Sequence, residues 1–390
     1  MIARQRRQLV SHVIVSLVLA AALGAAGCAS PGPIVAELPA AAGCRTTIAP
    51  DGTTPAQQVR WIRPEAAEER AALDDWCRAV GPAVVVTSPQ APLPDAESSD
   101  LVVISWNVNV GGGDIAGLVG SLRSGGLTGH PVSRFVLLLQ EAFRDGPDVP
   151  RGAVAGARAA GAIRPHVVNR DRTGIVSIAN ALGLALAYVP SMRNGTGFEP
   201  GEDRGNAILS TEPLSDVTAV ELPFERQRRV AVGASITTNG PDGEPLTLRF
   251  TDVHLDNRAP ARRLWLFATP MRLRQVRGLL LALDRTGPAI VGGDFNTWYG
   301  FDDPVFNEIA GAFDDRIPTD RRPTFAGLLR LDHLFFRLPD EWQAATSRIE
   351  KFGSDHHPLM ARIGMPAGLD DRLPAWPQPR PTSDLLPVLR

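Results

Sequence analysis

The feature that most constrains the fold of this chain is a series of nine apolar runs between residues 101 and 363. Runs such as "LVVISWNVN", "RFVLLLQE" and "PAIVGGDFN" have the length and the aliphatic, β-branched content of strands. The others are "LALAYVPSM", "NAILST", "VAVGASITT", "LTLRFTDVHL", "RLDHLFF" and "LMARI". Helical patterns at 174–184 and 271–284 lie between them. Many strands and few helices predict an α/β fold, a layered sandwich of β-sheets with helices on the outer faces.

Composition narrows the classes of function. The chain has 390 residues, of which 44% are hydrophobic, enough for one large core or two ordinary ones. A net charge of -2 and a pI near 6.4 provide no overall basic field, which argues against passive coating of nucleic acid but not against an enzyme that visits it. Lys351 is the only lysine, so covalent catalysis by lysine is not expected.

The N-terminus has the pattern of an export signal. A basic start, "MIARQRR", precedes the apolar run 13–27, which is too short for a comfortable membrane span. Cys28 follows small residues that are similar to the bacterial lipobox, in which the cysteine is lipidated. The pattern predicts a signal peptide at 1–27 and anchoring to the bacterial cell envelope through lipidated Cys28. An ordinary signal peptide with a chance cysteine is the alternative.

Three further segments flank or precede the main domain. Residues 28–99 are interpreted as a tether plus an N-terminal helical segment, with Pro64 placed for a first helical turn. Cys44 and Cys77 form an even pair in an exported chain, which predicts a disulfide, with two unpaired thiols as the alternative. Residues 100–365 are expected to form the catalytic domain, and the Pro-rich tail 366–390 to be irregular.

Polar residues recur where the apolar runs end. Asn107 and Asn109 alternate with apolar residues, and Asp294 and Asn296 share a face if the chain stays extended. Further examples are Glu141 in "LQE", Asp252 and His254 in "TDVHLDN", Asp332 in "LDH", and Asp355, His356 and His357 in "SDHHP". Each alone has an ordinary explanation in turn chemistry or as a structural histidine. The complete set, in six places, requires a common explanation.

In this order, "SWNVN", "LQE", "RGNAILS", "DVHLDN", "GGDFN", "LDHLFF" and "SDHHP" resemble the endonuclease/exonuclease/phosphatase superfamily of deoxyribonuclease I-like proteins. Its members include nucleases, sphingomyelinases and inositol polyphosphate phosphatases. The resemblance spans residues 101–363, and "GGDFN" and "SDHHP" are its most specific parts. It implies a four-layer sandwich, two β-sheets with helices outside, and a divalent-metal site.

The resemblance also implies a metal site and its cofactor. Glu141 would be the principal ligand, Asn107 would support the metal and the phosphate, and Asp355 would complete the environment. The cofactor would be Mg²⁺, with Mn²⁺ possible, since hard oxygen ligands favour these ions over zinc. In several nucleases of this superfamily an acidic residue stands at the position of Asn109, so this site would carry one less negative charge.

The catalytic residues implied by the resemblance surround the phosphate. Asp294 would orient or deprotonate the attacking water, and Asn296 would hold a phosphate oxygen. His254 would donate to the phosphate, and Asp332 would orient His356. These types suit phosphodiester hydrolysis because charge accumulates on the phosphoryl oxygens and the in-line water needs a base.

Several residues beside the motifs have two interpretations. Arg144 and Arg204 could contact phosphate, and the arginine groups 225–229, 258–263 and 272–277 could contact a nucleic-acid backbone or be solvated helix faces. Trp298 and Tyr299 could stack on a base or touch a lipid headgroup. His333 and His357 are expected to point away from the site.

The function predicted is a metal-dependent phosphodiesterase that uses in-line water attack, with a nuclease-like enzyme as the first hypothesis. A sphingomyelinase-like or other phospholipid phosphodiesterase is the second, because a membrane tether would hold the enzyme near lipid. A catalytically inactive surface binding module is the third. The partners expected are a phosphodiester substrate and the membrane, with no protein partner predicted. A nucleotide-binding P-loop, an "HExxH" helix and a "GxSxG" elbow are absent from the sequence.

Overall fold

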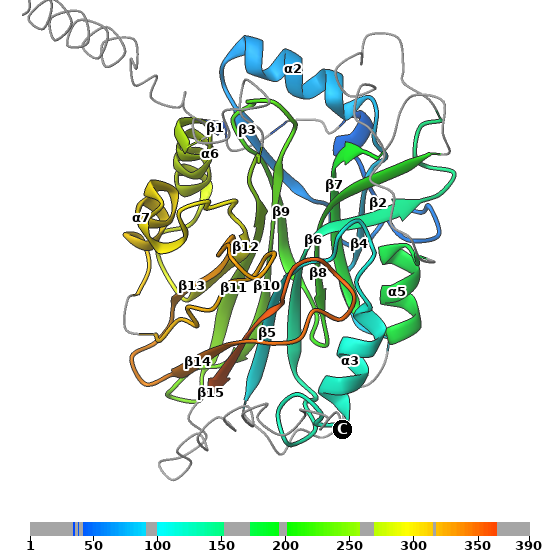
Figure 1. Cartoon of the computed structure of the whole chain (residues 1–390). Helices are drawn as coiled ribbons and strands as arrows, with labels where there is room; N and C mark the ends of the chain where they lie inside the picture. Colours follow the sequence, from blue (N-terminus) through cyan, green and yellow to red (C-terminus); the bar gives the residue numbers. More distant parts are fainter. Residues whose placement is uncertain are drawn as a thin grey trace, which may run out of the picture. The chain divides into compact units, whose positions relative to one another are not determined.

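The computed structural model describes residues 34–35, 38, 42–90, 100–151, 172–194, 201–257, 269–314 and 317–364. The predicted signal peptide, Cys28, the arginines of 258–263 and the tail 366–390 lie outside these ranges. Within them the chain forms two mixed β-sheets, of seven and eight strands (Figure 1).

The strands follow the expected runs. The eight-stranded sheet has the order β14 (Gln343–Arg348), β15 (Leu359–Gly364), β5 (Leu101–Asn107), β6 (Phe135–Asp145), β8 (Glu202–Ser210), β7 (Ala185–Arg193), β4 (Ala83–Val86), β2 (Thr47–Ile48). The seven-stranded sheet has the order β1 (Ile34–Val35), β3 (Arg60–Pro64), β9 (Ser215–Glu221), β10 (Val230–Asn239), β11 (Pro245–His254), β12 (Ala289–Asp294), β13 (Asp332–Arg337). All nine predicted runs are strands. β9 and β14 were not predicted, because "SDVTAVE" and "QAATSR" carry little of the apolar pattern that marks a strand.

Helices cover the outer faces of both sheets. α3 (Ile115–Arg123) and α5 (Ile175–Leu182) pack on the eight-stranded sheet, and α6 (Thr269–Ala282) and α7 (Pro304–Ala310) pack on the seven-stranded sheet. Figure 1 shows these two pairs on opposite sides. Short 3₁₀ turns, η1 (Gly43–Arg45) and η3 (Gly300–Asp302), complete the elements together with α2 (Ala67–Cys77). The predicted four-layer sandwich is confirmed.

The main core lies between the sheets. Val103 and Leu138 from one sheet face Val232, Phe250 and Ile290 from the other, and all are fully buried. The central strands β5 and β6 are parallel, as are β11 and β12. A strand that is covered on both faces has to be apolar on both faces, which is why these segments appear in the sequence as continuous apolar runs.

Two glycines of "GGDFN" permit close packing around β12, one against the neighbouring strand and one between the two sheets. A Cβ on Gly293 would lie 1.9 Å from the carbonyl oxygen of Val253 on β11, and one on Gly292 would lie 2.8 Å from side-chain carbons of Leu138 and Leu334. Glycine is therefore required at these positions for close approach, the first between strands and the second between sheets. The close fit at Gly293 also fixes β12 against β11, so that Asp294 lies in register with His254.

The N-terminal segment is integrated into both sheets. It contains the expected helix, α2, but also β3, which pairs with β9, and β4, which pairs with β7. Pro64 ends β3, and α2 begins at Ala67, so the prediction that this proline starts the helix is wrong. The predicted disulfide is present between Cys44 and Cys77. Among the residues described, no helix is both long and apolar enough to cross a membrane.

Candidate active site

A cleft of about 370 Å³ opens where the ends of β5, β6, β11 and β12 meet the loops before β13 and β15. Seven of the eight predicted metal and catalytic residues line it: Asn107, Glu141, His254, Asp294, Asn296, Asp355 and His356. The eighth, Asp332, is buried beside His356. The structure thus brings together residues that are scattered over 250 positions of sequence, between Asn107 and residue 356.

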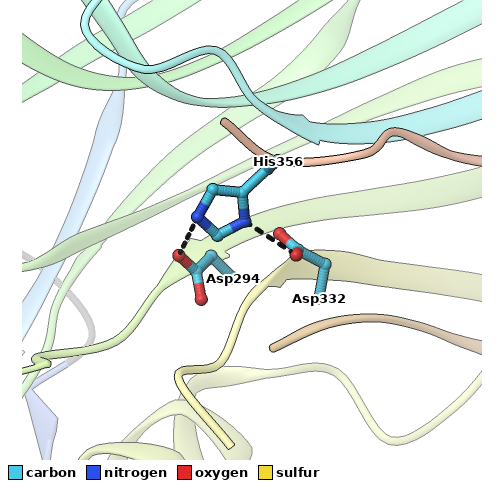
Figure 2. Close-up of side chains that lie close together, drawn as sticks. All are labelled: Asp294, Asp332 and His356. Carbon is cyan, nitrogen blue, oxygen red and sulfur yellow. Dashed lines mark hydrogen bonds and ion pairs between the residues drawn. The ribbon is translucent and has the colours of Figure 1, made fainter. Parts of the chain in front are cut away.

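His356 lies between Asp294 and Asp332, with one ring nitrogen directed at each carboxylate (Figure 2). Nδ1 of His356 lies 2.8 Å from Oδ2 of Asp332, and Nε2 lies 3.9 Å from Oδ2 of Asp294. A carboxylate on Nδ1 fixes the ring orientation and directs Nε2 toward the cleft. His254 approaches the same aspartate, with its Nε2 3.5 Å from Oδ2 of Asp294.

Burial and neighbouring charges shift the pKa values of His356, Asp294 and His254 to different extents and in different directions. Burial opposes protonation of His356, but the carboxylates of Asp332 and Asp294 outweigh it and raise the pKa of His356 to about 10. Burial, together with the charge of Asp332, raises the pKa of Asp294 to about 7. Burial and the nearby Arg229 guanidinium lower the pKa of His254 well below its usual value. At neutral pH the cleft therefore holds one imidazolium, one neutral imidazole and one carboxyl that titrates.

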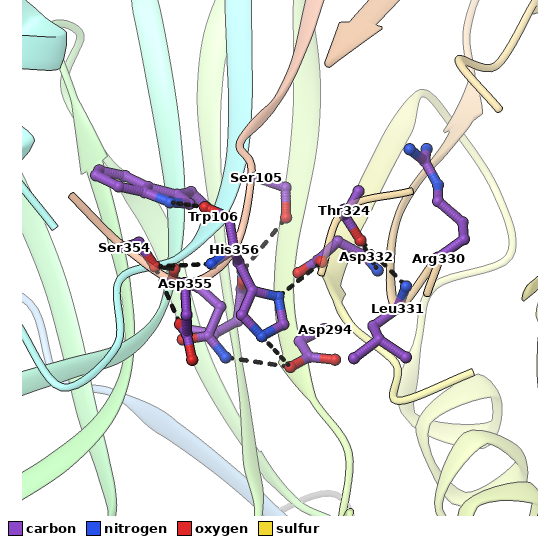
Figure 3. Close-up of polar contacts among 12 residues, drawn as sticks. Ser105, Trp106, Asp294, Thr324, Arg330, Leu331, Asp332, Ser354, Asp355 and His356 are labelled. Carbon is purple, nitrogen blue, oxygen red and sulfur yellow. Dashed lines mark hydrogen bonds and ion pairs between the residues drawn. The ribbon is translucent and has the colours of Figure 1, made fainter. Parts of the chain in front are cut away.

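Backbone and ring contacts hold His356 in place (Figure 3). The indole Nε1 of Trp106 donates to the carbonyl of His356 at 3.2 Å, and the backbone N–H of His356 donates to Oγ of Ser354 at 3.2 Å. The Ser354 hydroxyl in turn donates to the carbonyl of Asn107 at 2.6 Å. The Phe325 ring packs on the imidazole, with 4.7 Å between ring centroids. The last motif is thereby joined to the end of β5.

Asp294 and Asn296 both face the cleft, but not through an extended chain. β12 ends at Asp294, and Asn296 has a left-handed backbone with φ 51°. The backbone N–H of Asn296 donates to Oδ1 of Asp294 at 2.9 Å, and its side-chain amide donates to the carbonyl of Leu255 at 3.1 Å. This is an Asx turn. Nδ2 of Asn107 donates to the other Asp294 oxygen at 3.1 Å.

Three residues of the cleft lining have a left-handed backbone. Glu141 has φ 55° and Asn109 has φ 51°, as Asn296 does, and none of the three is glycine. Glu141 lies where the pairing of β6 with β8 shifts register, which identifies a β-bulge that re-aims its side chain. A left-handed non-glycine residue costs about 1–3 kcal/mol, so the surrounding structure has to hold these side chains in place.

The donors around Glu141 suit a hard divalent cation. Glu141, Asn107 and Asp355 all line the cleft and offer carboxylate and amide oxygens. The Glu141 carboxylate has a distant ion pair, 3.5 Å from Nη1 of Arg204, which leaves it accessible to a cation. Mg²⁺ needs only one or two carboxylates because it keeps several waters. The residues present therefore fit Mg²⁺ or Mn²⁺.

A second cluster of potential ligands, Asp294, Asp332 and His356, has ligand atoms within 4.8 Å of one another. Its histidine already uses Nδ1 in the 2.8 Å hydrogen bond to Asp332, and His356 is the residue whose protonated form the carboxylates favour. A protonated imidazole cannot bind a metal. We therefore interpret this cluster as acid–base machinery rather than as a metal centre.

Of the two arginines that the sequence suggested as phosphate contacts, one lines the cleft and the other does not. Arg204 lines the cleft. Arg144 does not: it is buried in an ion pair with Asp203, with 2.6 Å between Nη2 and Oδ2, so a phosphate contact by Arg144 is wrong. Side chains alternate between the two faces of β6 beyond the bulge at Glu141, and the side chain of Arg144 is on the face away from the cleft. Within the 225–229 group, Arg229 lines the cleft, whereas Arg228 is fully buried in an ion pair with Glu221.

Some of the histidines and aromatic residues next to the motifs line the cleft, and others do not. His333 lies in an aromatic cluster with Phe295 and Phe306, and His357 places Nδ1 2.8 Å from the carbonyl of Ile349, so both point away from the cleft as expected. Trp298 lines the cleft, whereas Tyr299 is exposed and does not belong to the lining. Of Trp298 and Tyr299, only Trp298 therefore contributes an aromatic ring to the cleft lining.

Sequence reasoning missed several lining residues: Gln227, Asn257, Phe325 and Leu331, and it did not single out Arg229 within its arginine group. Gln227 and Arg229 lie in the loop between β9 and β10, and Phe325 in a loop before β13. Loops carry no periodic pattern that indicates the direction of a side chain. The segment "ERQRR" indicated positive charge, but it did not indicate which of its side chains faces the cleft.

A separate cavity of about 310 Å³ lies over the seven-stranded sheet, lined by residues of β3, β9, β10, β11 and β12. Its charges oppose one another, since Arg60, Arg249 and Arg337 accompany Asp216 and Asp284. It shares no lining residue with the cleft. The chemistry is therefore assigned to the cleft.

Sequence comparisons relate the chain to known proteins. Residues 104–356 match the sequence model of the Endonuclease/Exonuclease/phosphatase family. A UPF0294 protein from Vibrio vulnificus (strain YJ016) is 35% identical over 97 residues, 24% of this chain and 34% of that protein. A UPF0294 protein from Vibrio cholerae (strain El Tor Inaba N16961) is 39% identical over 83 residues, 20% of this chain and 29% of that protein. The chain spans about a third of the length of these curated relatives.

Among solved structures, an endonuclease/exonuclease/phosphatase from Beutenbergia cavernae is similar, with 18% identity and a TM-score of 0.45, over 68% of this chain and 72% of that one. The family match runs from β5 to His356 and includes every motif that contributes to the cleft. The chain belongs to the endonuclease/exonuclease/phosphatase family.

Proposed function

We propose that this protein is a metal-dependent phosphodiesterase that hydrolyses its substrate by in-line attack of water. The observation that carries the proposal is the Asp332–His356 pair, which faces Asp294 across a cleft that also holds Glu141. A base, a cationic donor and an oxygen-rich metal site within one cleft are the groups that phosphoryl transfer to water requires.

The side chains of the cleft have complementary roles in this proposal. Asp294 accepts the proton of the attacking water, and Asn107 orients its carboxylate through the 3.1 Å hydrogen bond. His356, protonated and held by Asp332, faces the phosphate and stabilises its developing negative charge. His254, neutral, donates a hydrogen bond to a phosphoryl oxygen, and Asn296 donates through its amide.

Glu141, Asn107 and Asp355 are the residues that would hold Mg²⁺ or Mn²⁺. The bound cation would neutralise phosphate charge and help to position water. Arg204 and Arg229 supply positive charge to the same cleft, which suits a phosphodiester rather than a neutral ester.

For the substrate, we propose nucleic acid. Trp298 gives the cleft an aromatic surface on which a base can stack, beside the two arginines. A phospholipid headgroup is the alternative, favoured by the predicted anchor at Cys28, which would hold the enzyme at a membrane. An inactive surface binding module is the third outcome.

A parallel assay tests these possibilities. The purified chain with Mg²⁺ or Mn²⁺ is incubated with plasmid DNA, RNA and sphingomyelin vesicles, beside the Asp294→Asn variant. We expect cleavage of nucleic acid, and loss of several orders of magnitude in the variant with its fold intact. Turnover of the lipid alone would select the phospholipid enzyme. Turnover of none, with folded protein and metal present, would favour the binding module.

We also propose that the protein is exported and anchored to the bacterial cell envelope through lipidated Cys28. The support is the basic, apolar and small-residue order of residues 1–28. Detergent-phase partitioning of wild type and Cys28→Ala tests this. Wild type is expected in the detergent phase and the variant in the aqueous phase, and equal partitioning would contradict the lipid anchor.

A further inference from the structure

We propose that Arg45 and Glu221, which lie outside the cleft, are positioning residues that place the cleft arginine Arg229 through its neighbour Arg228. The inference rests on the proposed function, since it assigns Arg229 to the phosphodiester site. It makes the disulfide-closed N-terminal segment part of the machinery that shapes the cleft.

The centre of the arrangement is the fully buried carboxylate of Glu221, at the end of β9. Nε of Arg228 donates to Oε1 at 2.8 Å, and Nη2 and Nε of Arg45 donate to Oε1 and Oε2 at 2.9 and 3.1 Å. Nε of Arg63 lies 3.6 Å from Oε2. Arg228 and Arg45 thus both donate to one buried carboxylate, and Arg63 adds a third positive charge near it.

Arg228 transmits this position to the cleft. Its Nη1 also donates to the carbonyls of Pro190 and Ser191, at 2.8 and 3.3 Å, so its side chain is held on two sides. Arg229, the next residue, points into the cleft and donates from Nη2 to Oε1 of Gln227 at 3.1 Å. The Arg229 carbonyl accepts the backbone N–H of Leu222 at 3.0 Å, which continues the pairing of β9 with β10. Neighbouring residues of paired backbone point in opposite directions, so holding Arg228 against Glu221 directs Arg229 toward the cleft.

The other side of the loop is fixed independently. Oδ2 of Asp256 accepts the backbone N–H groups of Arg226 and Gln227, both at 3.0 Å. Glu225 pairs with Arg274 of α6 at 3.1 Å, and Arg274 also pairs with Glu69 of α2. The loop is therefore tied down at its start by Asp256 and at its end by the Glu221 cluster.

The N-terminal segment supplies two arginines of the cluster. Arg45 directly follows Cys44, and Asp74, three residues before Cys77, accepts from Arg45 at 2.8 Å and from Arg63 at 3.0 Å. The disulfide between Cys44 and Cys77 thus ties together the two stretches that carry Arg45 and Asp74. Opening it would release Arg45 from the Glu221 carboxylate without removing any charge.

The choice of variants follows from the burial of the cluster. Glu221→Gln would leave the buried Arg228 without its anion and risks unfolding, so it is not the primary test. Arg45→Gln removes one partner, and Cys44→Ala/Cys77→Ala removes only the tie. The matched control is Arg134→Gln, which breaks a comparable pair with Glu212, 2.8 Å long, at the far end of β6 from Glu141.

The first measurement is hydrogen exchange of the backbone amides of residues 224–230 in the full chain. We expect faster exchange there in Arg45→Gln and in the double cysteine variant, and unchanged exchange in Arg134→Gln. This readout does not depend on activity. Equal exchange in the wild type and in both N-terminal variants would overturn the inference.

The second measurement is hydrolysis of bis(p-nitrophenyl) phosphate with Mg²⁺. We expect KM to rise about tenfold in Arg45→Gln with little change in kcat, as for a lost contact present in both ground and transition states. The same substitution in an Arg229→Met background is expected to have no further effect. A full additional loss in that background would show that Arg45 does not act through Arg229 and would overturn the inference.

The two failures can be told apart. If the wild type hydrolyses no phosphodiester with either metal, the proposed function fails, and the exchange measurement alone decides whether Arg45 positions the loop. If the wild type is active and the loop loosens in Arg45→Gln while KM is unchanged, the proposed function stands and this inference fails.

Discussion

Nδ1 of His356, in the loop before β15, lies 2.8 Å from Oδ2 of Asp332, the first residue of β13 and 24 positions away in sequence. The other Asp332 oxygen is buried without a hydrogen-bond partner among the described residues. A buried carboxylate oxygen without a hydrogen bond lowers the stability of the folded state, even when the other oxygen accepts from a histidine. In the proposed mechanism this cost is offset by the orientation and charge that Asp332 gives to His356.

The first prediction concerns this pair. Asp332→Asn keeps the shape but removes the charge that favours the imidazolium, so the pKa of His356 is expected to fall from about 10, and activity to fall about 100-fold or more. NMR titration of His356 and kinetics on a phosphodiester check both effects. A matched Asp320→Asn variant, at a carboxylate that pairs with Arg322 away from the cleft, is expected to retain activity.

The second prediction is the pH profile. Asp294 has to be ionised to accept a proton, and burial raises its pKa to about 7, so kcat/KM should rise as the pH increases through about 7. His356 has to be protonated, so the rate should fall above about 10. The result is a bell-shaped profile. A rate that is flat between pH 5 and pH 9 would contradict the role of Asp294.

The third prediction concerns the metal. EDTA is expected to abolish hydrolysis, and added Mg²⁺ or Mn²⁺ to restore it. Glu141→Gln removes the carboxylate charge, so the Mg²⁺ concentration for half-maximal activity should rise about tenfold or more. Glu202→Gln, on the same sheet but paired with Arg172 outside the cleft lining, is the control. Hydrolysis that persists in excess EDTA would contradict the proposed mechanism.

The fourth prediction concerns stability. The disulfide closes a loop with a sequence separation of 33, which in the chain-entropy model is worth about 4 kcal/mol. Cys44→Ala/Cys77→Ala should lower the free energy of unfolding by about this amount, measured by urea unfolding with the oxidised wild type as reference. A change below about 1 kcal/mol would mean that the loop is already ordered in the unfolded ensemble.

The fifth prediction concerns the close approach at "GGDFN". Gly293→Ala would place a Cβ 1.9 Å from the Val253 carbonyl oxygen, so β12 has to move, at a cost of about 3 kcal/mol or more. Gly120→Ala in α3 is the matched control, because its Cβ would meet nothing within 4 Å and alanine favours a helix by about 1 kcal/mol. Thermal unfolding of both variants is the measurement, and equal melting temperatures would refute the steric argument.

The sequence by itself determined the layers of this protein and most of the polar residues that line its cleft. Strand runs from "LVVISWNVN" to "LMARI" were predictable because hydrophobic periodicity is local, and motifs such as "GGDFN" and "SDHHP" are specific at short range. The half-polar β9 and β14 lack that periodicity. They form because neighbouring strands offer them hydrogen-bonding edges.

Tertiary structure decided the rest, because side-chain direction in loops and at bulges depends on partners far away in sequence. Arg144 and Arg204 looked equivalent, yet one is buried against Asp203 and the other lines the cleft. Arg228 and Arg229 are adjacent, and only the tertiary structure shows that the first packs on Glu221 and the second lines the cleft. The expected extended path from Asp294 to Asn296 is an Asx turn, since the hydrogen bond to Asp294 and the contact with Leu255 outweigh the preference for extended backbone.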